Sequence, residues 1–400
     1  MEIWREGRIR DFADVKGGKR LPKGKQLVGF PTAHPYIRIR DIGKSKVLQL
    51  TADYEYVDDE TQKDISRYIV AKGDILISVV GTIGLIGIVG DTLDGANQTE
   101  NCDKLTNLNG IDRDYLYYYL VSSLGQAEIK KGTVGAVQPK LPLKNIQDLL
   151  IHYPTLETQR KIASVLSALD NKIEKNTEIN ENLAQQAQAV FLHLFGNNDS
   201  LTPATIADVT LNVTDGVHNT VHDDPEGEYL LLSCKNIKGG SLTVGSSERK
   251  ISLETFEKLR RRTKLAKGDV LISSVGTVGE LLLLNTEPAN YEFQRSVAMV
   301  KPNPAVVSPA YLSESLVSQK AELINAAHGA VQQCLFISDI AGFPIGVPTT
   351  EDLRKFDETV VPMLDAITAN EAESLRLAAL RDTLLPRLMS GELDVSELDL

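Results

Sequence analysis

Residues 72–84 read KGDILISVVGTIG, and residues 267–279 read KGDVLISSVGTVG. The two stretches share ten residues in the same order, 195 positions apart. A motif that returns at such a distance indicates that the chain consists of two copies of one structural unit. Three further pairs keep nearly the same spacing: LVS at 120–122 and 316–318, GAVQ at 135–138 and 329–332, and PTLETQRK at 154–161 with PTTEDLRK at 348–355.

The first part of each copy, about 150 residues, favours an α+β domain. Short apolar runs such as ILISVV, LIGIV, YLLLS and ELLLL are bounded by Gly, Pro, Asn and Asp, which is typical of strands. Helical patterns occur at 114–131 and 309–327. We therefore expect a strongly twisted or barrel-like sheet with helices, in which GTIG and GTVG form tight turns rather than ligand loops.

The second part of each copy predicts a long helix. Apolar residues in the first copy alternate in steps of four and three, which is typical of a coiled-coil seam. Asn176 and Asn180 interrupt this seam, and Gly196 with Asn197 supplies a stop. The seam comprises Ile162, Leu166, Leu169, Ile173, Asn176, Asn180, Leu183, Ala187, Val190 and Leu194.

The second copy repeats this pattern, with Asn370 and Ser374 as its polar pair. Pro362 and Pro386 are expected to break or kink this helix, because proline lacks the amide hydrogen that the helix ladder needs. The matching polar centres suggest that the two helices pack on each other as an antiparallel coiled coil. The expected domains are two similar recognition-type domains at 1–153 and 199–347, spacer helices at 154–198 and 348–392, and an acidic tail at 393–400.

The net charge of −11 argues at first against nucleic-acid binding. However, the acidic excess lies mainly in the two helical segments, with a net charge of −2 over 151–199 and −7 over 349–400. Residues 1–46 instead hold 12 basic and 5 acidic residues. A second basic run comprises Lys258, Arg260, Arg261, Arg262, Lys264 and Lys267. Each run alone is as compatible with a solvated face as with a nucleic-acid contact.

Several function classes find no support in the sequence. No apolar run is long enough to cross a bilayer, and the N-terminus lacks a secretion signal, so a cytoplasmic protein is expected. Cys102, Cys234 and Cys334 lie far apart without a CxxC pair, which favours neither disulfides nor zinc. His218 and His222 have metal-like spacing, but a polar loop is the preferred interpretation. No phosphate loop, methylation motif or nucleophile–base pair appears, so we expect no catalytic site, cofactor or metal.

The motifs, in their order, resemble the specificity subunits of Type I restriction–modification enzymes. LETQRKIASVLSALDNKIEKNTEINENLAQQAQAVFLHLFG resembles their central spacer, and LRDTLLPRLMSGEL resembles their C-terminal spacer. WREGRIRDFADVKGG and ATIADVTLNVTDG resemble the starts of their target-recognition domains, and the 72–84 and 267–279 stretches resemble the signature inside those domains. The likeness extends over nearly the whole chain, twice.

This resemblance implies a non-catalytic subunit that binds double-stranded DNA. Each recognition domain would read one half of a bipartite target, and the helices would hold the two domains apart. Methyltransferase subunits would supply catalysis, and an ATP-dependent restriction subunit could join them. The first spacer is consistent with this role, because 39 helical residues would measure about 58 Å, against about 34 Å for one turn of DNA.

Residues able to read bases in the major groove are Arg and Lys for guanine, and Asn and Gln for adenine. The expected DNA contacts of the first domain are Lys19, Arg20, Lys23, Lys25, Arg38, Arg40, Lys44 and Gln138. Those of the second domain are His218, Asn219, Lys235, Asn236, Lys238 and Gln332.

Three alternatives remain open. A related system with a fused or different nuclease would use the same architecture. A coiled-coil scaffold whose domains bind protein would not need two domains that differ in detail. An independent enzyme would need motifs that the sequence lacks.

Overall fold

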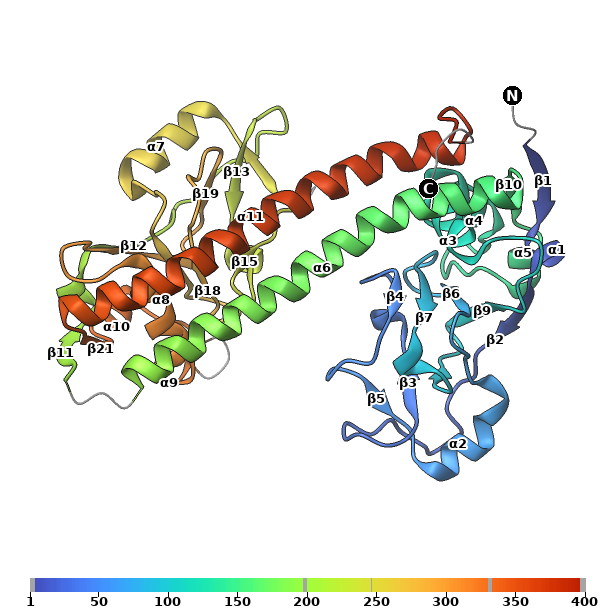
Figure 1. Cartoon of the computed structure of the whole chain (residues 1–400), viewed down its shortest axis with the longest axis horizontal. Helices are drawn as coiled ribbons and strands as arrows, with labels where there is room; N and C mark the ends of the chain where they lie inside the picture. Colours follow the sequence, from blue (N-terminus) through green and yellow to red (C-terminus); the bar gives the residue numbers. More distant parts are fainter. Residues whose placement is uncertain (1–3, 197–199, 246, 330–332, 396–400) are drawn as a thin grey trace. The chain divides into compact units, whose positions relative to one another are not determined.

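The structure, a computed structural model, describes residues 4–196, 200–245, 247–329 and 333–395 (Figure 1). The chain divides into two compact units. The first unit contains Met1–Glu174 and Ser374–Leu400, and the second contains Lys175–Glu373. Each unit therefore includes one α+β domain and one half of each long helix.

The first unit is built on a five-stranded sheet with the order β2-β9-β6-β7-β4. A three-stranded sheet, β5-β3-β8, and the pair β1-β10 accompany it. The strands are β1 (Arg5–Arg8), β2 (Asp14–Gly17), β3 (Pro35–Ile37), β4 (Val47–Leu48), β5 (Glu55–Tyr56), β6 (Ile75–Ser78), β7 (Ile86–Val89), β8 (Asn97–Gln98), β9 (Cys102–Thr106) and β10 (Leu150–Tyr153). The helices are α1 (Ile9–Phe12), α2 (Asp59–Ile65), α3 (Arg113–Val121), α4 (Ser123–Gly132) and α5 (Leu143–Gln147).

The second unit repeats this arrangement with the sheets β12-β20-β17-β18 and β16-β13-β19 and the pair β11-β21. A further pair, β14-β15, has no equivalent strand pair among the described residues of the first unit. The strands are β11 (Thr202–Thr205), β12 (Thr210–Asp215), β13 (Tyr229–Leu232), β14 (Ile237–Lys238), β15 (Ser241–Leu242), β16 (Arg249–Ile251), β17 (Val270–Ser273), β18 (Leu281–Leu283), β19 (Tyr291–Phe293), β20 (Val297–Pro302) and β21 (Pro344–Val347). The helices are α7 (Leu253–Thr263), α8 (Pro309–Ser318), α9 (Lys320–Asn325) and α10 (Ile337–Ala341).

The equivalent strands confirm the internal repeat. Tyr36 of β3 pairs with Asn97 in parallel, and Leu231 of β13 pairs with Glu292 in the same way. Both residues of the second pair lie 195 positions after those of the first. The expected α+β class with two similar domains is confirmed.

The repeated motif forms the hairpin β6–β7 in one unit and β17–β18 in the other. Its serine fixes the turn, because Ser78 Oγ donates to Thr82 O and accepts from Leu85 N, at 2.6 and 2.8 Å. Ser273 makes the same two bonds with Thr277 and Glu280. The glycines of the turns have positive φ angles between +76° and +87°. The expectation of tight turns is therefore confirmed.

The aspartate of the motif has a structural role as well. Asp74 accepts from Ala71 N at 2.9 Å and pairs with Lys104 Nζ at 2.8 Å. Asp269 makes the equivalent bonds with Ala266 and Lys301, at 3.0 and 2.6 Å. Both aspartates are buried, so the Lys-Gly-Asp sequence joins a turn to the adjacent strand.

The long helices are α6 (Leu156–Phe195), drawn in green, and α11 (Thr350–Met389), drawn in red (Figure 1). The residues of the predicted α6 seam are all buried or half-buried. In the second unit Phe191 and Phe195 pack against Phe356, with ring centroids 6.0 and 5.6 Å apart. In the first unit Ile162 and Leu166 share a core with Leu388 and Met389.

The polar centre of the seam joins the two helices within the second unit. Asn176 Nδ2 donates to Glu373 Oε2 at 2.8 Å, and Asn370 Nδ2 donates to Asn180 Oδ1 at the same distance. As numbers rise along α6 they fall along α11, so the packing is antiparallel, as expected. In the first unit Arg381 pairs with Asp170 at 2.7 Å.

Of the expected break or kink at Pro362 and Pro386, the break does not occur. α11 continues through both residues from Thr350 to Met389. Both prolines are exposed. The carbonyl groups that lose a partner at these positions can therefore be hydrated, and the residues on the packed side keep their contacts.

Candidate nucleic-acid interface

One short turn in each unit collects the segments that carry most of the predicted DNA contacts. We name it the hub turn, residues 98–101 in the first unit and 293–296 in the second. In the first unit the hub turn bonds to the loop after β2, to the end of β3 and to the hairpin that the repeated motif forms. We call this hairpin the signature hairpin; it is β6–β7 in the first unit and β17–β18 in the second. The backbone bonds are Lys19 N to Gln98 O (3.3 Å), Thr99 N to Ile37 O (3.1 Å) and Val79 N to Asn101 O (2.8 Å).

The second unit uses the same connections. Its hub turn holds the loop after β12, the segment that follows β13, and the signature hairpin. The bonds are Val217 N to Phe293 O (3.0 Å), Gln294 N to Leu232 O (2.8 Å), Ser274 N to Ser296 O (2.9 Å) and Cys234 N to Ser296 Oγ (3.1 Å). Loops remote in sequence therefore converge in each unit, as a recognition surface requires.

A glycine allows the first of these loops to approach the hub turn. A Cβ added at Gly18 would lie 2.0 Å from Thr99 O, and one at Gly216 would lie 2.0 Å from Phe293 O. Neither position tolerates a side chain without a backbone shift. The glycines of VKGG and VTDG thus fix the course of the residues that follow them.

Arg20 lies at the hub turn of the first unit. Its Nε donates to Glu100 Oε1 at 2.8 Å, and its side chain is 83% exposed. The neighbouring Lys19 is exposed, with Nζ 5.8 Å from the ring centroid of Tyr68. Both residues are available to a ligand outside the protein.

The other predicted residues of the first unit differ in their partners. Lys25 faces α2, where it pairs with Glu60 at 2.5 Å. Arg38 and Arg40 both pair with Glu55, Arg40 at 3.0 Å. Lys23 and Lys44 are exposed and form no ion pair among the described residues. The structure thus brings Lys19 and Arg20 together at the hub turn, while Lys25 is partly neutralised elsewhere.

In the second unit His218 follows the glycine and contacts Asp215, with Nε2 2.6 Å from Oδ2. Arg262 of α7 pairs with the same aspartate at 3.0 Å. Lys235, on the turn joined to Ser296 through Cys234, is exposed and pairs with Glu248 at 3.1 Å. Asn219 and Lys238 are exposed as well.

Asn236 differs from the other candidates because it is buried. Its Oδ1 accepts from Ser233 N at 2.9 Å, and its Nδ2 donates to Thr243 O at the same distance. The oxygen and the nitrogen of the side-chain amide therefore both hold the local turn, and the side chain does not reach the surface.

Gln138 lies on an exposed loop that is attached to the signature hairpin. Lys140 forms backbone bridges with Val80 of the hairpin and with Val134. Gly135 has a φ of +96°, and Val137 is 93% exposed. This loop carries the repeated GAVQ sequence, and Gln138 itself is exposed. Gln332 lies outside the described residues.

Sequence reasoning missed Arg295, which is in the hub turn of the second unit. Arg295 is exposed, and its side chain forms no hydrogen bond or ion pair among the described residues. Its backbone N donates to Val217 O at 3.1 Å. The repeat spacing of 195 residues makes Arg295 the equivalent of Glu100, so an alignment of the two copies could have revealed Arg295 as a candidate.

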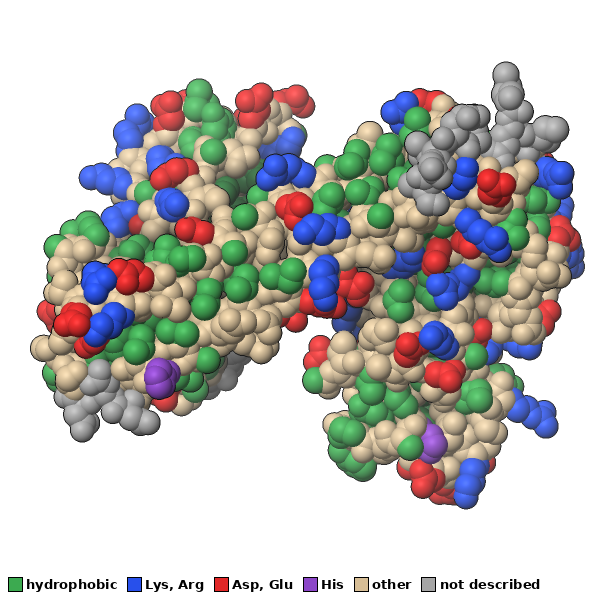
Figure 2. All heavy atoms as spheres, viewed as in Figure 1, with side chains coloured by type: hydrophobic (Ala, Val, Ile, Leu, Met, Phe, Trp, Pro, Cys, Tyr) green, Lys and Arg blue, Asp and Glu red, His purple; other side chains and the backbone are tan. Residues whose placement is uncertain are grey.

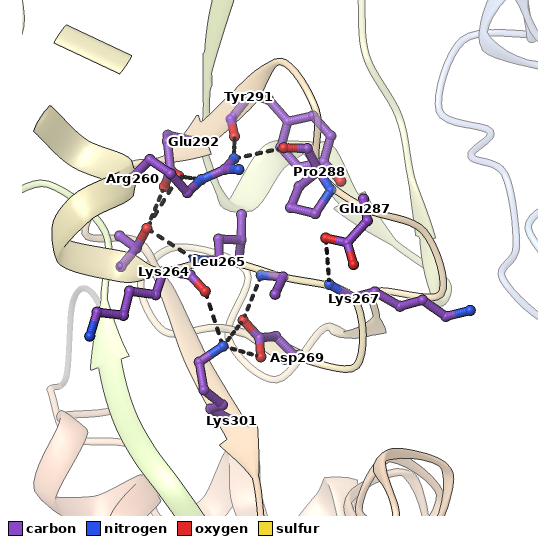
Figure 3. Close-up of polar contacts among 12 residues, drawn as sticks. Arg260, Lys264, Leu265, Lys267, Asp269, Glu287, Pro288, Tyr291, Glu292 and Lys301 are labelled. Atoms are coloured by element: carbon purple, nitrogen blue, oxygen red, sulfur yellow. Dashed lines mark hydrogen bonds and ion pairs between the residues drawn. The ribbon is translucent and has the colours of Figure 1, made fainter. Parts of the chain in front are cut away.

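The basic run on α7 contains both a structural and a surface group. Arg260 points inward, where its guanidinium bonds to Glu292, to Pro288 O at 2.7 Å and to Tyr291 O at 2.9 Å (Figure 3). Glu292 is fully buried, and desolvation raises its pKa although Arg260 opposes the shift. Arg261 and Arg262 remain exposed. The run is therefore only partly available to a ligand.

Figure 2 shows Lys and Arg side chains interspersed with acidic ones on the visible face of each unit. Over the described ranges, no group of three or more His, Cys, Asp or Glu residues has the geometry of a metal site. No helix in the described part of the chain has the length and apolar character to cross a bilayer.

Comparison with known proteins gives consistent results. Residues 1–185 match the family model described as the Type I restriction modification DNA specificity domain. The specificity subunit of the Type I restriction enzyme MjaIX from Methanocaldococcus jannaschii is 26% identical, over 99% of this chain and 94% of that protein. The HindI specificity subunit of Haemophilus influenzae is 23% identical, over 72% of this chain and 79% of that protein.

The fold agrees as well. The S subunit of a Type I restriction-modification system from M. genitalium has a TM-score of 0.58 at 16% identity, and the match covers 97% of this chain and 96% of that one. The domain match and the relatives lead to one conclusion: residues 1–185 match the Type I restriction modification DNA specificity domain, and nearly the whole chain is similar to specificity subunits of Type I restriction enzymes.

Proposed function

We propose that this chain selects the DNA sequence on which a Type I restriction–modification complex acts. Each α+β domain reads one half of a bipartite target. The observation that carries this proposal is the hub turn, which collects the same loops in both units but presents different charged side chains. Two readers with a common scaffold and different contact residues are what a two-part, asymmetric target requires.

The chain itself is proposed to be non-catalytic. Methyltransferase subunits would bind it and supply the transfer chemistry, and an ATP-dependent restriction subunit would join the complex for cleavage. The net charge of −11 fits this division, because partner subunits can supply much of the attraction to phosphate. A complex of this kind would work on chromosomal DNA in the cytoplasm.

The proposed DNA contacts are those predicted residues whose side chains reach the surface. In the first domain Lys19 and Arg20 lie at the hub turn, and Lys23, Lys44 and Gln138 are exposed. Arg38 and Arg40 would contact DNA together with Glu55. In the second domain His218, Asn219, Lys235 and Lys238 are exposed. Asn236 is withdrawn from the proposal because it is buried.

The proposed domain limits, 1–153 for the first domain and 199–347 for the second, follow the strand pairs. β1 pairs with β10, which ends at Tyr153, and β11 pairs with β21, which ends at Val347. Cutting at these limits keeps both pairs intact. The segments 154–198 and 348–392 contain α6 and α11, and 393–400 is the proposed acidic tail.

A domain exchange tests the function. Residues 1–153 are replaced by the corresponding domain of a relative with a different target, and the hybrid is expressed with its methyltransferase partner. Sequencing of methylated bases in the host genome should show a new first half-site and an unchanged second half-site. A change in both half-sites would contradict the model of two separate readers. If the wild-type complex methylated DNA without any sequence preference, the proposed function itself would be rejected.

The same complex tests the absence of catalysis. The purified chain, incubated with adenosylmethionine and DNA, should transfer no methyl groups until the methyltransferase subunit is added. Transfer by the chain alone would show that it is an enzyme.

A further inference from the structure

The two hub turns carry opposite charges at one equivalent position. The parallel pairs Tyr36–Asn97 and Leu231–Glu292 align the two units with a constant difference of 195 residues. On this alignment Glu100 of the first unit corresponds to Arg295 of the second. Both residues lie in the turn that collects the recognition loops.

A second position changes with it. Gly18 and Gly216 make the same close approach to the hub turn, and two residues later the chain has Arg20 in the first unit and His218 in the second. The first unit thus combines Arg20 with Glu100, whereas the second combines His218 with Arg295. A guanidinium group lies at the hub turn in both units, that of Arg20 in the first and that of Arg295 in the second, and it comes from a different segment in each. In the second unit Arg262 of α7 adds another beside Gly216, where it donates to Gly216 O at 3.0 Å.

The contacts show how each guanidinium is presented. Arg20 bonds Glu100 through Nε, and its terminal amino groups form no hydrogen bond among the described residues. His218 contacts Asp215, and the side chain of Arg295 forms no hydrogen bond or ion pair among the described residues. The backbone of Arg295 is fixed by Val217 and by Ser274, whose Oγ donates to Arg295 O at 3.3 Å.

The chemistry favours a base over a phosphate as the ligand. A carboxylate beside Arg20 cancels much of the attraction to a phosphate, but it fixes the orientation of the planar fork. A fixed fork is suited to the two acceptors O6 and N7 of guanine in the major groove. Arg295 lies within the hub turn of the second unit and is exposed, so its guanidinium can offer a fork to the same two acceptors, although no carboxylate among the described residues orients it.

Resting on the proposed function, we infer that Arg20 and Arg295 each select a guanine at equivalent places in the two half-sites. Glu100 is a positioning residue that orients Arg20. The first unit has the pair Arg20 and Glu100 where the second has His218 and Arg295. Each unit therefore keeps one arginine that can bind guanine, although the surrounding loops differ.

The first test uses the complex with its methyltransferase partner and Arg295→Ala. Binding is measured to a panel of duplexes in which each base pair of the target is changed in turn. Discrimination at one G·C pair of the second half-site should fall by about 5- to 150-fold. The first half-site should be read as before. Arg354→Ala serves as the control, because it removes an exposed arginine of α11 in the same unit.

The second test concerns the first unit. Arg20→Ala should lower discrimination at one G·C pair of the first half-site by a similar factor. Glu100→Ala should lower discrimination at the same pair by a smaller factor, while Glu100→Gln, which keeps an acceptor oxygen, should restore most of it. If Glu100 had a purely structural role, Glu100→Ala would instead lower the thermal stability, and discrimination would not fall at one particular base pair.

Two outcomes would overturn the inference. If Arg295→Ala weakens binding to all sequences equally and flattens the salt dependence, the residue contacts phosphate. If its binding profile equals that of the wild type, the residue lies outside the interface. Failure of the proposed function is distinguishable, because the wild-type complex would then lack any bipartite preference.

Discussion

Arg38 and Arg40 share the carboxylate of Glu55, and Arg40 Nε also lies 3.7 Å from Asp41 Oδ1, so as proposed DNA contacts they differ from unpaired cations. Replacing both arginines by Ala should weaken DNA binding through the first domain. If they contact bases, discrimination should fall by about 1–3 kcal/mol at particular positions. If they contact phosphate, binding titrations at several salt concentrations should show uniform weakening and a flatter slope. Unchanged affinity would remove both residues from the interface.

The buried pair Arg260–Glu292 permits a sharp test of stability. Arg260→Met should destabilise the second unit by about 3–5 kcal/mol, because Glu292 would be left buried without its cation. The neighbouring Arg261 is the control, since its side chain is 73% exposed and its contact with Glu257 is 3.9 Å long. Arg261→Met should change the unfolding free energy by at most about 0.5 kcal/mol. Equal effects in denaturant titrations would refute the inward role of Arg260.

Glu314 of α8 is 7% exposed, and desolvation raises its pKa to about 7 from an ordinary value of 4.5. Because the folded state holds the proton more tightly, the stability it contributes is present below about pH 4.5 and is lost as the pH rises through 7. Glu314→Gln should therefore stabilise the protein by about 3 kcal/mol at pH 8 and by about 1 kcal/mol or less at pH 5. Thermal unfolding at both pH values measures this difference.

The control for that measurement is Glu322→Gln, which changes an exposed carboxyl on the adjacent α9. Its effect should be small and similar at both pH values. A constant gain for Glu314→Gln across the pH range would show that packing, not ionisation, accounts for the change.

At the residue scale, the sequence shows which side chains are charged but not whether each one points toward the solvent or into the protein. Arg20 and Arg260 both belong to basic runs, yet one is exposed and the other is directed at a buried carboxylate. Asn236 matched the pattern of a base reader, but its amide holds a turn. The direction of such a side chain depends on partners far away in the sequence, so local composition could not predict it.

At the element scale, periodicity was informative because burial repeats with the helix turn. The seam over 162–194 predicted α6 correctly, and its polar centre predicted the contact with α11. The expected break at Pro362 does not occur, although the helix lacks one backbone hydrogen bond there. A helix held by apolar contacts on both sides of an exposed proline can continue through it.

The polar centre of the helix pair should couple two residues. Asn180→Leu and Asn370→Leu alone should each lower the melting temperature, because each leaves an amide without its partner. Together they should restore it or raise it, since an apolar pair is favoured at a seam. The coupling in a double-mutant cycle should be about 0.5–3 kcal/mol. Asn182→Leu, on the exposed face of α6, should have little effect, and simple additivity would contradict the pairing.

At the scale of the whole molecule, the repeat was the most informative feature of the sequence. A spacing of 195 residues predicted two similar domains, and the strand registers of both units agree with it. The convergence of loops at the hub turn could not be predicted in the same way. It depends on backbone bonds between segments such as 18–19 and 98–102, which have no sequence signal of their own.

The helices are proposed to act as a ruler, and matched insertions test this. α6 has 40 residues and measures about 60 Å, and both helices pass without interruption from one unit to the other. Four residues inserted after Asn180, with four more in α11 before Ile367, would add about 6 Å and rotate the downstream part of each helix by about 40°. Seven residues in each helix would add about 10 Å and keep the seam nearly in phase, so this variant should be better tolerated.

The measurement is the methylated motif in cells that carry each variant. The bases read by each domain should stay the same, because neither domain changes. The unread gap should lengthen by about one or two base pairs for four residues and by about three for seven, given a rise of about 3.4 Å per pair. An insertion in α6 alone should abolish activity, since Phe191 and Phe195, which follow the insertion, would lose their register with Phe356. A paired-insertion variant that methylates with the original gap would show that the helices tether the domains without measuring the distance between them.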